Sequence, residues 1–388
     1  MPVERPLGDS PKGQNMHKLK HKLIWIGLGT LALLLRMGLA GRPDLIEQYY
    51  SRGLFLLLRQ SIDALFGWLP IPLLYLFVPF LLWRVGRGIG RWHRRAYRHW
   101  RLKAGDAALG ILAFLGGVVF LFLFLWGFNY GRMPLEAQLG LEIQPLALAE
   151  LKEELAHETP LLIRLRQAVS GAGEKALGPE ALPRGLERQL RQDLEHFLAE
   201  QGYPTVGRMR AYLIWPRGIF LRFGSAGLYF PWTGQGQVDA GLHPLQKPYV
   251  MAHELAHGYG FGDEGTCNFL AFLSASQSAD PFIAYAARLG YWRTLAANYR
   301  LYEPELYLEF RQSLPPGIQA DLDAINETML RYPDFFPYLR YAAYDAYLRA
   351  QGIEEGMLNY DRVIMMARSW RLKAAGQLEG FVPAEHER

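Results

Sequence analysis

The stretch VMAHELAHGYGFGDEGTCNFLAFL, residues 250–273, places two histidines four positions apart with a glutamate between them. The surrounding residues are mostly apolar, and three glycines then lead into two acids. At 3.6 residues per turn, His253 and His257 share one helix face, where both imidazoles can bind a single metal ion. Glu254 lies about 100 degrees further round the helix, where a general base can act on a metal-activated water.

A zinc ion that keeps one tetrahedral position for water needs a third protein ligand. The glycine-rich turn allows the chain to reverse and to start a second helix near Asp263. Glu264 lies on the first turn of that helix, and Asn268 follows one turn later on the same face. We predict that Glu264 is the third ligand. Asp263 is the second choice, as a helix cap, and His243 is the third.

The alternative interpretation is an exposed helix with two solvated histidines. It explains the apolar neighbourhood poorly, because buried histidines and a buried glutamate need partners. The chain has a single cysteine, Cys267, so an intramolecular disulfide and a four-cysteine zinc site are both excluded. Its position directly before Asn268 favours a small core residue over a zinc ligand.

Half of the 388 residues are apolar, and the first 130 residues contain the long uncharged runs. The sequence predicts three transmembrane helices, at about residues 23–40, 64–83 and 107–128. A cleaved signal peptide is the alternative for the first run, and a buried core helix is the alternative for the second, whose prolines would kink it. Residues 45–62 are amphipathic and are expected along the membrane interface. The chain is thus predicted to consist of a membrane anchor, residues 1–132, and a second domain, residues 133–388.

Basic residues predict the orientation of the anchor. Residues 84–105 contain seven arginines, one lysine and no acid, which places them in the cytoplasm. The lysine-rich N-terminus belongs on the same side, so the second domain is expected outside the cytoplasm. Much of the net charge of +5 lies in these two stretches, and we expect anionic lipid, not nucleic acid, as their partner.

The second domain is predicted to be mainly α-helical with a small β-sheet. Helical apolar spacing recurs at about residues 145–169, 180–202, 281–300, 304–314, 317–331, 334–351 and 360–376. Strand patterns are found at residues 210–216, 218–223 and 227–232.

The segment HELAHGYGFGDEGTCNFLAFL is similar to the H-E-L-A-H, G-F, acid, N-F-L-A pattern of a family of bacterial membrane proteins of unknown function, which itself resembles the gluzincin zinc metallopeptidases. The resemblance extends to FNYGR (128–132), GLYFPWTGQGQVDAGL (227–242), YDAYLRAQG (344–352) and NYDRV (359–363). It implies a zincin-like second domain, attachment to the bacterial cytoplasmic membrane, zinc on His253, His257 and Glu264, and Glu254 as the base. Thr266 and Cys267 depart from the family pattern, which has a second acid and an alanine there.

These observations predict a membrane-anchored zinc peptidase that hydrolyses peptide bonds with a zinc-activated water. An extended substrate is expected to pair with the strand at residues 227–232. The oxyanion-stabilising group is left open among Tyr259, His243, Tyr344 and Tyr347. The main alternative is a non-catalytic, membrane-anchored metal-binding or scaffold protein. An intramembrane protease is disfavoured, because the motif lies far beyond the last predicted span.

Overall fold

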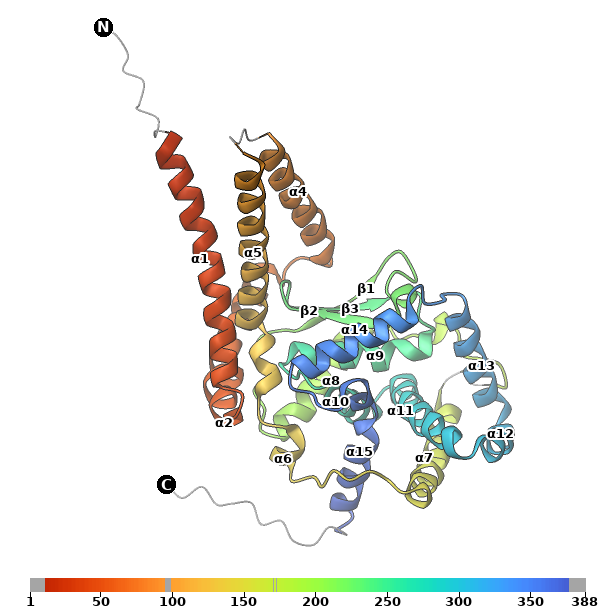
Figure 1. Ribbon diagram of the computed structural model, residues 1–388. Helices are drawn as coiled ribbons and strands as arrows, with labels where there is room; N and C mark the ends of the chain where they lie inside the picture. Colours follow the sequence, from red (N-terminus) through yellow and green to blue (C-terminus); the bar gives the residue numbers. More distant parts are fainter. Residues whose placement is uncertain (1–10, 95–98, 170, 172, 377–388) are drawn as a thin grey trace, which may run out of the picture.

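The computed structural model describes residues 11–94, 99–169, 171 and 173–376. It is mainly helical and contains one small sheet, as the sequence predicts (Figure 1). The helices of the body are α6 (Leu135–Leu139), α7 (Leu148–Ala168), α8 (Leu186–Glu200), α9 (Lys247–Gly258), α10 (Glu264–Ser276), α11 (Pro281–Tyr302), α12 (Pro304–Gln312), α13 (Pro316–Leu330), α14 (Pro337–Ala350) and α15 (Arg362–Ala374). The helices that the apolar spacing predicts are all present, with ends shifted by a few residues.

Three strands form the sheet in the order β1-β3-β2: β1 (Arg210–Ile214), β2 (Gly227–Phe230) and β3 (Gln235–Asp239). The central strand β3 pairs parallel with β1 and antiparallel with β2. The predicted strand at residues 218–223 is wrong. The Asp239 carboxylate accepts hydrogen bonds from the backbone amides of Gly218, Phe220 and Leu221, which curls this segment into a turn and a short 3-10 helix.

Each face of the sheet is covered by a different part of the chain. Helix α9 packs on one face so closely that a Cβ at Gly236 would lie 2.8 Å from the Cβ of Glu254. The other face is covered by the linker between α3 (Phe55–Phe66) and α4 (Leu74–His93). The Leu73 amide donates to Gln235 Oε1 at 2.9 Å, and Tyr212 donates to the Leu69 carbonyl at 3.2 Å. A glycine in the central strand therefore determines how near α9 lies to the sheet.

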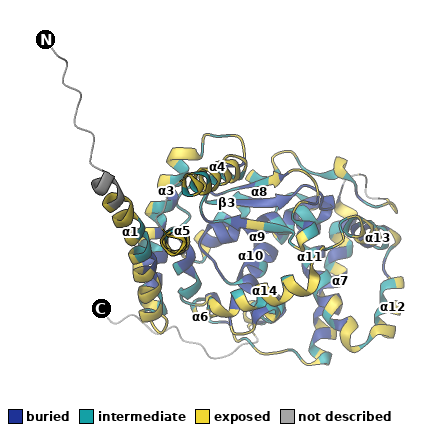
Figure 2. Ribbon diagram, turned by 45° about the horizontal axis from the view of Figure 1, so that its top comes forward, coloured by how far each residue is buried: buried dark blue, intermediate teal, exposed yellow. Residues whose placement is uncertain are grey.

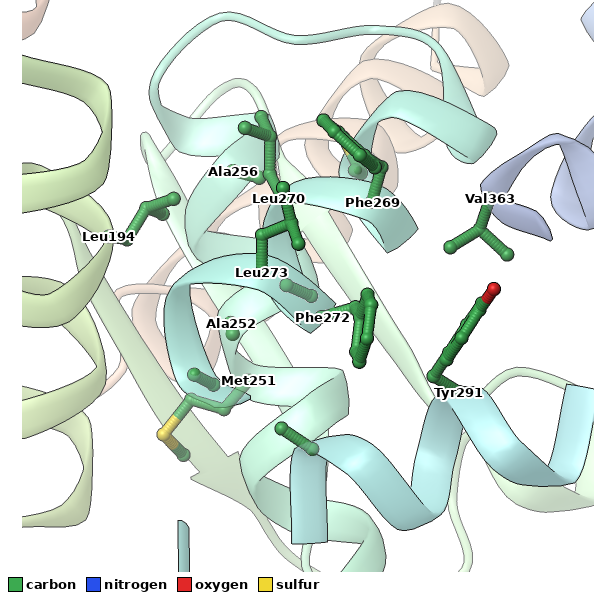
Figure 3. Close-up of a cluster of buried hydrophobic side chains, with 14 of the residues drawn as sticks. Leu194, Met251, Ala252, Ala256, Phe269, Leu270, Phe272, Leu273, Tyr291 and Val363 are labelled. Carbon is green, nitrogen blue, oxygen red and sulfur yellow. The ribbon is translucent and has the colours of Figure 1, made fainter. Parts of the chain in front are cut away.

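The core lies where α9 and α10 meet α8 and α11 (Figures 2 and 3). Small residues such as Ala252 and Ala256 on α9 are fully buried and allow the helices to approach closely. The rings of Phe272 and Tyr291 stack with centroids 4.1 Å apart. Figure 2 shows this buried centre in dark blue, and the two helices that carry the HExxH segment and Glu264 are largely buried within it.

Three long helices, α1 (Pro11–Gly38), α4 and α5 (Trp100–Leu125), stand at one side of the body (Figure 1). Among the described residues, α5 alone is long and apolar enough to cross a membrane. One predicted span, at residues 107–128, therefore largely coincides with the candidate membrane helix α5. The predicted spans at residues 23–40 and 64–83 are wrong.

The sequence gives a physical reason for each difference. Residues 64–83 do not form one helix, because α3 ends at Phe66 and α4 begins only at Leu74. Pro70 and Pro72 lie in this gap, where they cannot supply the amide hydrogens that a continuous helix needs. In α1, Lys22 and Arg36 lie at the two ends of the apolar run and shorten it.

Helices α1 and α5 pack along each other with glycines at the contact. A Cβ on Gly29 would lie 2.5 Å from the backbone of Gly116, so only glycine permits this approach. Lys22 Nζ and Asp106 Oδ1 form an ion pair of 2.5 Å between the same helices. The basic stretch 84–105 falls partly on residues 95–98, which lie outside the described part of the chain.

The amphipathic segment at residues 45–62 forms a π-helix, η1 (Ile46–Leu54), and most of α3. The sequence predicts that it lies along the membrane interface, but it packs largely against the body. Glu47 is paired with Arg132 at 2.7 Å, and Arg52 donates to the Gly202 carbonyl at 2.8 Å. This segment therefore joins the anchor firmly to the body.

Candidate metal centre

Helix α9 carries the two histidines on one face. Pro248 lies in its first turn, where the missing amide hydrogen has no cost. His253 and His257 are one turn apart, and their Nε2 atoms are 3.0 Å apart. The helix ends at Gly258, and Gly260 then adopts a φ of +89°, a backbone conformation that favours glycine. This turn directs the chain back toward the histidines.

Glu264 is the first residue of α10 and completes the cluster. Its Oε2 lies 3.1 Å from His253 Nε2 and 3.5 Å from His257 Nε2. Asp263 caps the helix by accepting a hydrogen bond from the Thr266 amide at 2.7 Å. Of the His, Cys, Asp and Glu residues that the structure describes, only these three form a group with metal-ligand spacing, and all three are buried.

The spacing of these three atoms suits a tetrahedral zinc ion. Two ligand atoms that are each about 2.0–2.1 Å from one zinc, at the tetrahedral angle, lie about 3.3 Å from each other. The three observed separations, 3.0, 3.1 and 3.5 Å, bracket that value. The residues present therefore fit a zinc ion with one position left open.

Hydrogen bonds behind the imidazoles determine which nitrogen faces the centre. His257 Nδ1 lies 2.8 Å from the Phe261 carbonyl oxygen, which only accepts, so Nδ1 carries the proton. His253 Nδ1 lies 2.8 Å from Asn268 Oδ1 and is oriented in the same way. When the imidazoles are neutral, both Nε2 atoms present lone pairs toward a carboxylate oxygen. Such an arrangement of acceptors is unfavourable when buried and calls for a cation.

Glu254 is buried beside this cluster and points toward β2. The Tyr229 backbone amide bonds its carboxylate, while Oε2 has no hydrogen-bond partner among the described residues. Burial raises the pKa of Glu254 to about 7, against the opposing effect of the two histidines. A carboxylate oxygen that is buried without a partner is what a general base with an unfilled water position would present.

The other candidate ligands are engaged elsewhere. The Asp263 carboxylate, besides capping α10, accepts from Asn359 at 2.7 Å and from Arg362 at 3.1 Å. His243 caps a short 3-10 helix through its Nδ1. Cys267 lies against the outer side of the His257 ring, with its Sγ 3.3 Å from Nδ1, and burial raises the pKa of its thiol to about 11. None of the three joins the cluster.

Among the four residues considered for oxyanion stabilisation, the structure brings Tyr344 to the cluster. Its hydroxyl donates to Glu264 Oε1 at 2.9 Å from α14, which crosses in front of α9 in Figure 1. The Tyr347 hydroxyl bonds that of Tyr130 at 3.1 Å. Tyr259 instead donates to Glu195 at 2.5 Å. Tyr344 is selected because α14, which is distant in the sequence, lies against Glu264. Local sequence spacing cannot predict this contact.

Several supporting residues carry no role in the sequence interpretation. Trp126, just after α5, donates from its indole to the His257 carbonyl at 2.8 Å, and Arg132 donates to the Gly260 carbonyl at 2.8 Å. Asn359 accepts from the Gly265 amide at 2.9 Å. Asn359 and Arg132 lie in the NYDRV and FNYGR segments, which follow the family pattern. Their place in that pattern was the signal from which the sequence could have identified them. The segment after α5 therefore contacts α9 and the turn that follows it directly.

No curated protein and no solved structure gives a significant match to the chain. A family described as "Protein of unknown function (DUF3810)" matches residues 50–367, which include the sheet, the whole candidate metal centre and most of the anchor. The chain belongs to this DUF3810 family of proteins of unknown function.

Proposed function

We propose that the protein is a membrane-anchored zinc metallopeptidase that hydrolyses peptide bonds, with His253, His257 and Glu264 as zinc ligands and Glu254 as general base. One observation carries the proposal. Two imidazole nitrogens and a carboxylate oxygen converge at tetrahedral ligand spacing, next to a buried glutamate oxygen that has no partner among the described residues. A purely structural metal site would have no use for that glutamate.

Zinc in this site would supply a Lewis acid that polarises a carbonyl and lowers the pKa of a water molecule toward 7. Glu254 takes the proton from the attacking water and passes it to the leaving amine. Its pKa of about 7 reflects burial, and added positive charge beside it would lower this value, so that the carboxylate is ionised at neutral pH.

The surrounding residues position these groups and the substrate. Asn268 and the Phe261 carbonyl hold the imidazoles with Nε2 toward the centre. Tyr344 holds the outer oxygen of Glu264, and because it bonds a proposed ligand it is the candidate we assign to oxyanion stabilisation. Strand β2 is at the edge of the sheet beside Glu254, and an extended peptide can add to such an edge by main-chain hydrogen bonds.

The same proposal includes the attachment to the membrane. Helix α5 crosses the bilayer, and α1 packs along α5 through the contact of Gly29 with Gly116. Many apolar side chains of α1, α4 and α5 are exposed, as lipid-facing residues would be. The start of α1, the end of α4 and the start of α5 lie at the same end of these helices (Figure 1). All three are basic, so this end is cytoplasmic and the body is on the other side.

Metal analysis and peptide hydrolysis with the purified full-length chain test the activity. The expected result is about one zinc ion per chain and cleavage of a peptide library, with Glu254→Gln retaining zinc but losing about 10²–10⁴-fold in rate. Equal cleavage by the wild type and Glu254→Gln would overturn the mechanism. Stoichiometric zinc without any cleavage would favour the alternative of a metal-binding scaffold.

Reporter fusions test the orientation independently. A reporter placed after residue 140 is expected to behave as extracytoplasmic, whereas one placed within residues 84–105 is expected to behave as cytoplasmic. The reverse pattern would overturn the topology and leave the metal chemistry untouched.

A further inference from the structure

Aromatic and apolar side chains gather on the edge of the body from which α4 and α5 extend. The loop after β1 rises at this edge in Figure 1, and the connection between α13 and α14 lies beside it. Six residues of these two segments are exposed, and we call them the interface patch: Trp215, Ile219, Phe223, Phe335, Phe336 and Leu339. Trp215, Phe223 and Phe336 are more than half exposed, at 53%, 55% and 57%. Rings that remain exposed together indicate a contact surface.

The two segments of the interface patch are fixed to each other. The Phe335 amide donates to the Arg222 carbonyl at 2.9 Å, and the rings of Phe223 and Phe335 meet edge to face at 5.9 Å. The Arg222 guanidinium lies 5.5 Å from the centre of the Phe335 ring. The patch is therefore one preformed surface made from two distant parts of the chain.

The interface patch is also fixed to the anchor. Tyr75, in the first turn of α4, accepts a hydrogen bond from the Trp215 amide at 2.7 Å and lies 3.0 Å from the Trp215 carbonyl, to which it donates. Beyond Tyr75, α4 continues with exposed apolar residues such as Leu76 and Phe80. The apolar surface of α4 thus leads directly to the loop after β1.

The charges of the patch suit lipid headgroups. The stretches Trp215–Phe223 and Phe335–Tyr341 contain three arginines, of which Arg340 is ion-paired with Asp334 at 2.7 Å, so that Arg217 and Arg222 carry the positive charge of the patch. The Arg217 guanidinium lies 4.7 Å from the centre of the Trp215 ring. Tryptophan, other aromatic residues and arginine together are typical of the boundary between lipid and water, where rings enter the headgroup layer and guanidinium groups meet phosphates.

We propose that the interface patch lies in the headgroup layer of the membrane that α5 crosses, so that the body rests on the bilayer surface. Strand β2 begins four residues after Phe223 and runs beside Glu254. The metal centre is then held close to the membrane, and polypeptides anchored in the same membrane are the substrate class within its reach. This last consequence rests on the proposed peptidase activity, whereas the docking itself does not.

Lipid quenching of a site-specific fluorophore tests the docking. Phe223→Cys and Phe336→Cys are each labelled with the environment-sensitive dye NBD in the full-length chain, while the native Cys267 is buried and shielded from the label. Leu301→Cys, 80% exposed at the end of α11 near α12, is the matched control on another part of the body. The labelled proteins are reconstituted in vesicles of anionic and zwitterionic phospholipid, with or without nitroxide-labelled lipid.

We expect nitroxide lipid to reduce the emission of the dye at positions 223 and 336 strongly, and more so when the nitroxide is near the headgroup than when it is near the chain end. The dye at position 301 should keep its emission. Equal emission with and without nitroxide lipid at positions 223 and 336 would overturn the proposal. A blue-shifted dye at these positions without nitroxide quenching would also overturn it, because it would indicate burial against protein. Neither result depends on peptide hydrolysis.

Discussion

Replacing Asn268 with alanine is expected to weaken zinc binding by about one to two orders of magnitude. Asn268 Oδ1 accepts from His253 Nδ1 at 2.8 Å, and the His253 side chain is almost entirely buried. Without this acceptor, binding through Nε2 leaves a buried N–H donor unsatisfied, which costs about 1–3 kcal/mol. At about 1.4 kcal/mol for each tenfold change, the dissociation constant should rise about 5- to 150-fold. This range agrees with the 10- to 100-fold that loss of such outer hydrogen bonds typically costs.

The assay is competition for zinc between the purified full-length variant and a chromophoric chelator. Asn268→Asp should bind zinc at least as tightly as the wild type, since a carboxylate is a better acceptor for the imidazole N–H. Ser274→Ala is the matched control, because Ser274 is buried on the same helix and its hydroxyl donates within that helix, to the Leu270 carbonyl. If Asn268→Ala and Ser274→Ala bind zinc equally well, the assignment of His253 as a ligand held by Asn268 is refuted.

Four further predictions concern stability. Gly236→Ala should lower the free energy of unfolding by about 1–3 kcal/mol, because the new Cβ would lie 2.8 Å from the Cβ of Glu254. Thermal unfolding should show this as a lower Tm. The control Gly173→Ala should keep the Tm of the wild type, because the space around Gly173 is open. Zinc at a concentration 1,000 times its Kd should stabilise the folded wild type by about 4 kcal/mol, and a chelator that removes this zinc should lower the Tm accordingly. The Tm of a His257→Ala variant should not respond to the chelator. Burial raises the pKa of Glu47, but Arg132 and Arg52 outweigh it and hold this pKa below the ordinary 4.5, so the stability that Glu47 contributes is present above pH 4.5 and lost as the pH falls further. A Glu47→Gln variant should lack this acid-dependent part of the Tm profile, and a parallel profile would contradict the assignment. Arg59 is buried, and neither its Nε nor its Nη1 has a hydrogen-bond partner among the described residues. Arg59→Met should therefore raise the Tm. A clearly lower Tm would contradict this prediction and show that the guanidinium is hydrogen-bonded in solution.

The sequence predicts the helices well and the sheet poorly, for identifiable reasons. Helices such as α11 and α13 follow from apolar spacing over many residues. The central strand β3, with the sequence QGQVD, has three polar residues and one glycine, although it is buried along its whole length. Its glycine accommodates α9, and such a requirement is visible only after the helix is in place.

The candidate metal centre is local, which is why spacing in the sequence predicts that its members lie together. His253, Glu254, His257 and Glu264 lie within two consecutive helices joined by a short turn. The contact of Tyr344 with Glu264 joins residues 80 positions apart, and that of Trp126 with His257 joins residues 131 positions apart. No periodicity or spacing encodes these contacts, so they required the structure.

The bond from the Trp126 indole to the His257 carbonyl has a practical consequence. Cutting the chain at residue 133, where the sequence suggests a boundary, would delete this indole, Arg132 and the linker that shields one face of the sheet. A fragment produced in this way would expose aromatic rings to water. It would also lose the hydrogen bond from Arg132 that stabilises the turn before Glu264. Biochemistry on this chain therefore belongs in detergent or nanodiscs with the helical N-terminal third retained, and an inactive truncated fragment would say nothing about the activity proposed for the intact protein.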